Sequence, residues 1–199
     1  MQKDVIEMLS YIFSIKGFVL SLDGLLLSFL IGAVIAYFTN ISLKTLYRIP
    51  YMFMLAVAFL GYVLLTYAIN LLVFRLIGTL PLTFLVLLAA IPPFLFGYIA
   101  MYLSVSRARD GFGKKGAAWL LVIPLLNLGL FIVTLDDDPE DKEEKPITRN
   151  PIETPAFMNG ATGVIVATII FTLSFSGGMM LVTYPSIIKI PELLYMGTR

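Results

Sequence analysis

The sequence predicts an all-α membrane protein, a polytopic bundle of five transmembrane helices with a kinked third helix. The first observation is composition, because 59% of the 199 residues are hydrophobic and 14% are charged, against about 45–50% and about 25% in an ordinary soluble domain. The second is that the apolar residues form uncharged blocks long enough to cross a bilayer core of about 30 Å. We expect one transmembrane domain over residues 1–199.

Five intervals have the length of about 20 residues that a spanning helix needs. They cover about residues 18–40, 50–74, 77–104, 116–135 and 158–184, and an acidic loop over 136–155 separates the last two. Pro92 and Pro93 stand in the middle of the third interval. Because proline has no N–H and its ring clashes with the preceding turn, we expect a kink or break there.

Composition excludes several classes of function. The chain has no Cys and no His, which removes disulfides, thiolate clusters, imidazole-bound haem and nucleophiles that depend on Cys or His. Its formal charge of +1 argues against a nucleic-acid partner. We therefore expect no catalytic residue, no metal site and no cofactor, and we predict that the protein is not an enzyme.

The loop between the third and fourth spans predicts the orientation. Basic loops favour the cytoplasmic side of a membrane. Alternation of five spans then places the N-terminus and the acidic loop outside and the C-terminus inside, with eight Lys and Arg residues inside and six outside. An inverted topology is the alternative. The loop contains the densest basic cluster of the chain, Arg107, Arg109, Lys114 and Lys115.

These four basic residues form a candidate lipid- or anion-binding site. They flank Gly111, Gly113 and Gly116, which match a dinucleotide-binding G-x-G-x-x-G pattern but follow a predicted membrane helix instead of a strand. A glycine loop that leads into a helix N-terminus favours an anion, and a lipid phosphate gains about 1 kcal/mol per nearby basic residue. The alternative is an ordinary positive-inside anchor without bound lipid.

The stretch over residues 106–129 resembles a known family. It contains SRARDG, then GKKG, then WLLVIPLLNLG, and is similar to the signature of the YhaH-like family of small bacterial inner-membrane proteins, which combines basic residues, an Asp, a glycine turn, Trp-Leu-Leu and Ile-Pro. Arg109 stands where the family has His, and Ala118 where a second Trp would fall. The resemblance implies the bacterial inner membrane and no established activity.

Small residues predict where helices approach closely. Without side-chain bulk, two helix backbones can come into contact inside a membrane. We expect the fifth span to pack tightly against a neighbouring helix or a partner protein. The glycines that we expect to mediate this packing are Gly160, Gly163, Gly177 and Gly178.

Together these features favour a non-enzymatic integral membrane protein that acts as an accessory, assembly or structural subunit of a larger membrane complex. Its expected partners are membrane lipids and other integral membrane subunits. One alternative is a lipid-processing enzyme, for which Asp110 with Arg107 and Arg109 would form the centre at the cytoplasmic face.

The other alternative is a small transporter or channel. Broken helices can build solute sites near the membrane midplane, and uncharged amides within spans either line such sites or hydrogen-bond between helices. The residues that would line the path are Asn70, Pro92, Pro93 and Asn127.

Overall fold

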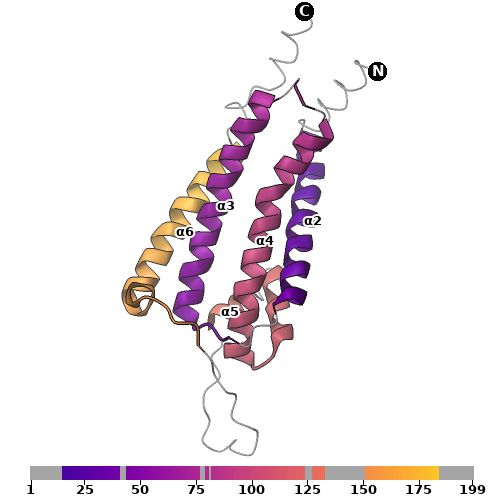
Figure 1. Cartoon of the computed structure of the whole chain (residues 1–199). Helices are drawn as coiled ribbons and strands as arrows, with labels where there is room; N and C mark the ends of the chain where they lie inside the picture. The colour runs from indigo at the N-terminus through magenta and orange to yellow at the C-terminus, as the bar shows by residue number, and fades with distance from the viewer. Residues whose placement is uncertain are drawn as a thin grey trace, which may run out of the picture.

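The computed structural model describes residues 15–40, 44–76, 79–80, 82–123, 127–132 and 151–183. Four long helices account for most of them: α2 (Ile15–Thr39), α3 (Arg48–Leu76), α4 (Leu82–Phe112) and α6 (Gly160–Thr183) (Figure 1). Three short helices come between α4 and α6: the 3₁₀ helix η1 (Lys115–Val122), α5 (Leu128–Ile132) and the 3₁₀ helix η2 (Ala156–Met158). The described residues contain no strand, so the helical fold class is confirmed.

Three helices are long and apolar enough to cross a membrane, over Arg48–Leu72, Leu87–Phe112 and Gly160–Met179. They overlap the second, third and fifth predicted spans and indicate a membrane protein. The first predicted span, 18–40, falls in α2, which has a shorter apolar stretch over Leu25–Thr39.

The prediction of a fourth spanning helix over 116–135 is wrong for the residues that the structure describes. These residues form η1 and α5, which at rises of about 2.0 and 1.5 Å per residue extend only about 16 and 8 Å. Pro124 stands between them in the sequence, and a proline cannot donate a helix hydrogen bond. Both short helices instead pack against α4, at the end where it finishes (Figure 1).

Because η1 and α5 replace a long fourth helix, the last helix begins at the other end of the molecule from the one that the sequence predicts. The segment that leads into α6 lies beside the segment that leads into α3, because Ile152 donates its backbone N–H to the carbonyl of Thr45 at 2.9 Å. Consequently α4 finishes and α6 begins at one end of the molecule, while α2 begins and α6 finishes at the other (Figure 1). The start of α2 and the finish of α6 therefore lie at the same end of the molecule (Figure 1), whereas the sequence predicts the two termini on opposite sides of the membrane.

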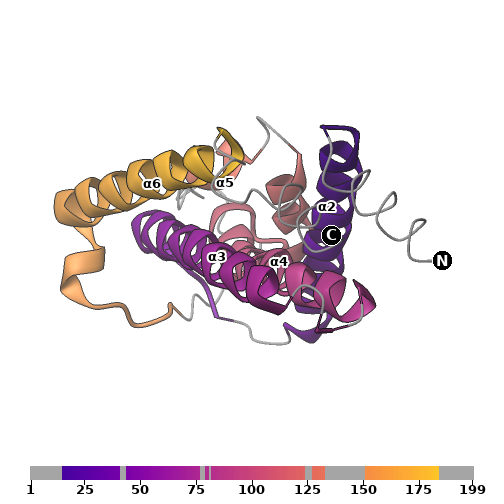
Figure 2. The ribbon, with the colours of Figure 1, turned by 90° about the horizontal axis from the view of Figure 1, so that it is seen from above.

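The four long helices form an open row. In the described residues α2 packs on α4, α4 on α3, and α3 on α6, and α2 and α6 lie at opposite ends of this row when it is seen from above (Figure 2). Each outer helix therefore has one principal long neighbour. Large apolar side chains such as Leu173 of α6, 65% exposed, face outward, as contact with lipid tails allows.

Helix α4 continues through Pro92 and Pro93 without interruption. The predicted break is therefore absent, and the kink in this helix stays a prediction. Both prolines are buried, and the carbonyl groups four residues before each of them lose their usual helix donors. The two prolines thus belong to the packed part of α4 and do not mark a gap in the helix.

Gly32 of α2 and Gly97 of α4 form the closest approach between two helices. A Cβ atom at Gly32 would lie 2.1 Å from the carbonyl oxygen of Phe94, and one at Gly97 would lie 2.1 Å from that of Phe29. No side chain fits at either position unless the backbones separate. Glycine on both helices therefore permits direct backbone contact between α2 and α4.

We predict that Gly97→Ala destabilises the protein by about 1–3 kcal/mol, the usual range for overpacking. The added methyl group collides with backbone, which cannot move aside as a side chain can. Unfolding in detergent micelles, followed by circular dichroism, measures the change. Gly177→Ala is the control, because its Cβ would meet Val63 at an ordinary 3.6 Å. Equal stability of the two variants would contradict the assignment.

The topology predicts a labelling pattern. The chain has no Cys, so Lys114→Cys, Glu153→Cys and Thr79→Cys each introduce a single thiol at an exposed position. In vesicles of one orientation, a membrane-impermeant maleimide should react with the thiols at 114 and 153 from the same side and with the thiol at 79 from the opposite side. A helix crossing at 116–135 would instead separate positions 114 and 153.

Candidate functional site

Basic side chains gather at one end of the helix row. Eight Lys and Arg residues fall in the part of the chain that the structure describes, and six of them lie where α2 and α4 finish and α3 begins (Figure 1). We call this the basic end and treat it as the candidate site. Its six cationic residues are Lys44, Arg48, Arg107, Arg109, Lys114 and Lys115.

Arg107 is almost completely buried, with 1% of its surface exposed. Its Nη1 donates to Oδ2 of Asp110, one turn further along α4, in an ion pair. Its Nε donates to the carbonyl oxygen of Leu130 in α5 at 2.7 Å. A buried charge without such partners is strongly destabilising. Arg107 therefore attaches α5 to the end of α4.

A second buried polar contact joins α3 to the same layer. The hydroxyl of Tyr51 in α3 lies 3.0 Å from that of Ser104 in α4, and Ser104 donates in turn to the carbonyl of Ala100 at 2.7 Å. Because the Ser104 proton is used in this way, the hydroxyl of Tyr51 donates the hydrogen bond and Oγ of Ser104 accepts it. The ring of Tyr51 lies 5.3 Å from that of Phe131 in α5, so α3, α4 and α5 meet at this level.

Arg109 and Lys115 converge on the end of α2. Nη2 of Arg109 and Nζ of Lys115 donate to the backbone carbonyl of Asn40 at 3.5 and 3.3 Å. Nζ of Lys115 also lies 4.4 Å from the ring centroid of Tyr37, and Trp119 of η1 packs on that ring at 5.3 Å. Cations at a helix C-terminus complement the negative end of its dipole. These two residues therefore cap α2.

Asn40 connects the end of α2 directly to α4. It is 2% exposed, and its Nδ2 donates to the carbonyl of Tyr102 at 3.2 Å. Oδ1 of Asn40 and Nη1 of Arg109 are buried without a hydrogen-bond partner. The polar network of the basic end is therefore incomplete at this position.

The four basic residues predicted to bind lipid do not form one surface. Arg107 is buried in its ion pair, and Arg109 and Lys115 cap α2, whereas Lys114 is exposed. Gly113, at a φ of 64°, ends α4 in the left-handed conformation that favours glycine. Three of the four predicted residues therefore have structural contacts within the protein.

The four glycines predicted to pack α6 have different environments. Gly160 has a φ of 63° and open space at its Cβ position, so it serves the start of the helix. A Cβ at Gly163 would lie 2.4 Å from the carbonyl oxygen of Met158, in the preceding turn. At Gly177 and Gly178 a Cβ would make ordinary contacts of 3.6 and 3.8 Å with Val63. Gly163 also lies close to α3, because its Cβ would come within 2.9 Å of Cγ2 of Ile49. Direct contact between two helix backbones is found at Gly32 and Gly97, between α2 and α4.

The residues predicted to line a transport path are not brought together either. Asn70 lies in α3 and Pro92 and Pro93 lie in α4, whereas Asn127 directly precedes α5 at the basic end. Asn127 accepts the backbone N–H of Leu130 at 3.0 Å and thereby belongs to the turn before α5. Of the four, only Pro92 lines the cavity described next.

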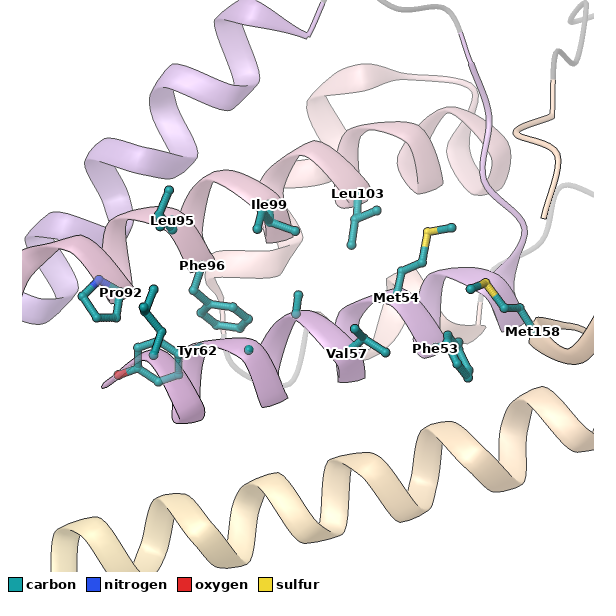
Figure 3. A pocket seen from close by; sticks show the side chains of 13 residues that line it. Phe53, Met54, Val57, Tyr62, Pro92, Leu95, Phe96, Ile99, Leu103 and Met158 are labelled. Carbon is teal, nitrogen blue, oxygen red and sulfur yellow. The ribbon is translucent and has the colours of Figure 1, made fainter. Parts of the chain in front are cut away.

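An apolar cavity of about 530 Å³, the α3–α4 cavity, lies between these two helices. Its lining runs from Phe53 to Leu65 on α3 and from Pro92 to Leu103 on α4, with Met158 of η2 added (Figure 3). Within this lining the hydroxyl of Tyr62 is the one polar side-chain group. An ion or polar solute would find nothing there to replace its water of hydration, so the cavity suits an apolar ligand.

The described residues contain no group of three or more Asp or Glu side chains that could hold a metal ion. Comparison with protein-family models, curated proteins and solved structures finds no match to this chain. The resemblance of residues 106–129 to the YhaH-like family stays a prediction.

We predict that Arg107→Met destabilises the protein by about 3–5 kcal/mol, because it leaves the buried Asp110 carboxylate without its cation. The double variant Arg107→Met/Asp110→Leu should recover most of this loss, since it removes both charges. Unfolding in detergent gives the coupling between the two positions. Lys114→Gln, at an exposed position, is the control and should stay within about 0.5 kcal/mol of the parent. A double variant no more stable than Arg107→Met would overturn the pairing.

Proposed function

We propose that the chain is a non-enzymatic integral membrane protein that acts as an accessory, assembly or structural subunit of a larger membrane complex. The observation that carries this proposal is the outer face of α6. This helix packs on α3 along one side, and its opposite side exposes hydroxyl residues between large apolar side chains. An outer helix with such a surface is suited to contact a helix of a partner subunit.

The outer face of α6 carries a stripe of exposed hydroxyl residues, Thr168, Thr172 and Ser176, at intervals of four residues. Thr168 donates to the carbonyl of Val164 at 2.8 Å and Thr172 to that of Thr168 at 2.9 Å. The threonines are therefore small, satisfied positions within an apolar surface. Membrane helices associate through such small residues, because there the partner backbone can approach closely.

The contacts of the candidate site give the two alternatives less support. Asp110, the centre of the alternative lipid-processing enzyme, is 6% exposed and paired with Arg107. For the transporter alternative, the α3–α4 cavity is apolar and Asn127 lies away from it. Both observations favour a subunit role.

We further propose that the protein resides in a bacterial inner membrane with its basic end in the cytoplasm. The resemblance of residues 106–129 supports the membrane, and the positive-inside rule supports the orientation, since six of the eight described Lys and Arg residues lie at that end. The start of α2 and the finish of α6 then both lie on the outer side of the membrane. The sequence predicts the outer side for the N-terminus but the inner side for the C-terminus, so the proposal differs from that prediction at the end of the last helix.

We predict that Thr168→Leu/Thr172→Leu reduces partner binding about tenfold or more, because the added bulk separates the two helix backbones. The measurement is extraction of the tagged protein from its native membrane in gentle detergent, followed by native mass spectrometry. The matched control, Ala68→Leu/Ala89→Leu, adds bulk at exposed positions of α3 and α4 and should retain the partner. A parent protein that elutes alone, or a Thr variant that keeps its partner, would contradict the proposal.

A further inference from the structure

The α3–α4 cavity has the shape of a narrow groove. Its lining on α3, from Phe53 to Leu65, covers twelve helical steps, or about 18 Å at a rise of about 1.5 Å per residue. The space that the centre of a water molecule can reach has a volume of about 530 Å³, which over this length is about 6 Å across. With the water radius of about 1.4 Å added at each wall, the groove is about 9 Å wide. The side chains that form its walls are shown in Figure 3.

This size selects the occupant. An α-helix with its side chains is about 10–12 Å across and does not fit a groove about 9 Å wide. The footprint of about 160 Å² is also far below the roughly 800 Å² per partner of a stable protein interface. A hydrocarbon chain does fit, because carbon atoms in contact are about 3.5–4.0 Å apart.

The groove also has a definite depth in the bilayer. Phe53 lies five residues after Arg48, at which α3 begins, so the groove begins about 8 Å from the basic end. Its length of about 18 Å then takes it to about 26 Å from the basic end, which is within the thickness of a hydrocarbon core of about 30 Å. Because its nearer end lies beside the basic end, a chain that enters there comes from the leaflet at that end.

Charge indicates which lipid supplies the chain. A headgroup above this groove lies at the level of Lys44 and Arg48, both of which have exposed side chains, and Arg48 stands at the positive N-terminal end of α3. Each basic residue near an anionic headgroup adds to its binding. We propose that the α3–α4 cavity binds one acyl chain of an anionic phospholipid, whose headgroup is held at the basic end.

Gly61 provides an independent observation for the same site. It lies in the interior of α3 and lines the cavity, and a Cβ atom there would meet nothing within 4 Å. Packing within the chain therefore does not require glycine, although glycine weakens a helix interior relative to other residues. The open space at Gly61 is the space that the acyl chain occupies.

Filling the groove tests the proposal. The parent protein, delipidated in detergent and incubated with an equimolar mixture of phosphatidylglycerol and phosphatidylcholine, should retain one phosphatidylglycerol per chain in native mass spectrometry. Gly61→Leu should reduce this retention about tenfold or more, because its side chain occupies the groove. Ala68→Leu, an exposed position of the same helix outside the cavity, should bind as the parent does.

Further variants separate loss of binding from loss of folding. Leucine has the higher helix propensity, so Gly61→Leu should unfold at a temperature no lower than the parent, and Ala58→Leu, also in the lining, provides a second filled groove. Arg48→Gln should reduce the preference for phosphatidylglycerol while a chain still binds. Undiminished lipid retention in both filled variants would overturn the site, and equal retention of the two lipids by the parent would overturn the headgroup assignment.

The test is independent of the proposed subunit role. Thr168→Leu/Thr172→Leu alters the outer face of α6, away from the groove lining, and should bind phosphatidylglycerol as the parent does. Loss of lipid in this variant would place the lipid on α6 and overturn the groove assignment.

Discussion

The buried guanidinium of Arg107 determines how the chain is arranged after α4. It needs more than one acceptor, and it finds the carboxylate of Asp110 on its own helix and the carbonyl of Leu130 in α5. Because a buried charge that lacks a partner is strongly destabilising, α5 is held against the end of α4. The chain therefore enters α6 from the basic end. Helix α6 packs on α3 and runs antiparallel to α4 (Figure 1).

With α6 packed on α3, the four long helices form an open row. The closeness of neighbouring helix backbones differs from one pair to the next. Gly32 and Gly97 bring the backbones of α2 and α4 into contact, whereas larger side chains such as Phe96 and Tyr62 separate α3 from α4 and wall the cavity between them. Helix α4 therefore has close backbone contact with α2 on one side and a groove toward α3 on the other. Both follow from the size of the residues at the interface. Residue size at a helix interface determines how near the neighbouring backbone can come.

Much of this fold is predictable from hydropathy alone. Two predicted spans coincide with α3 and α6 to within two residues, and a third overlaps α4 with its ends shifted by five and eight residues, since an uncharged block of sufficient length is a direct requirement of the bilayer. The gathering of basic residues at one end was also predictable from the loop sequence. Their individual roles were not, because Arg107 and Lys114 look equivalent in a charge count although one is buried and the other exposed. The spacing of Arg107 and Asp110, three residues apart on one helix, was the available signal for an ion pair.

The fourth predicted span shows that hydropathy does not determine whether an apolar segment crosses a membrane or packs on protein. An apolar segment needs shelter from water, but protein can provide that shelter as well as lipid, and residues 116–135 meet the length requirement for either. A crossing must satisfy nearly all of its backbone N–H and C=O groups within its own helix. A proline alone does not prevent this, since α4 continues through Pro92 and Pro93. Packing on α4 removes that requirement, because the carbonyl of Leu130 finds its donor in Arg107. A polar contact with a neighbouring helix, which a hydropathy window does not register, thus holds α5 at the end of α4.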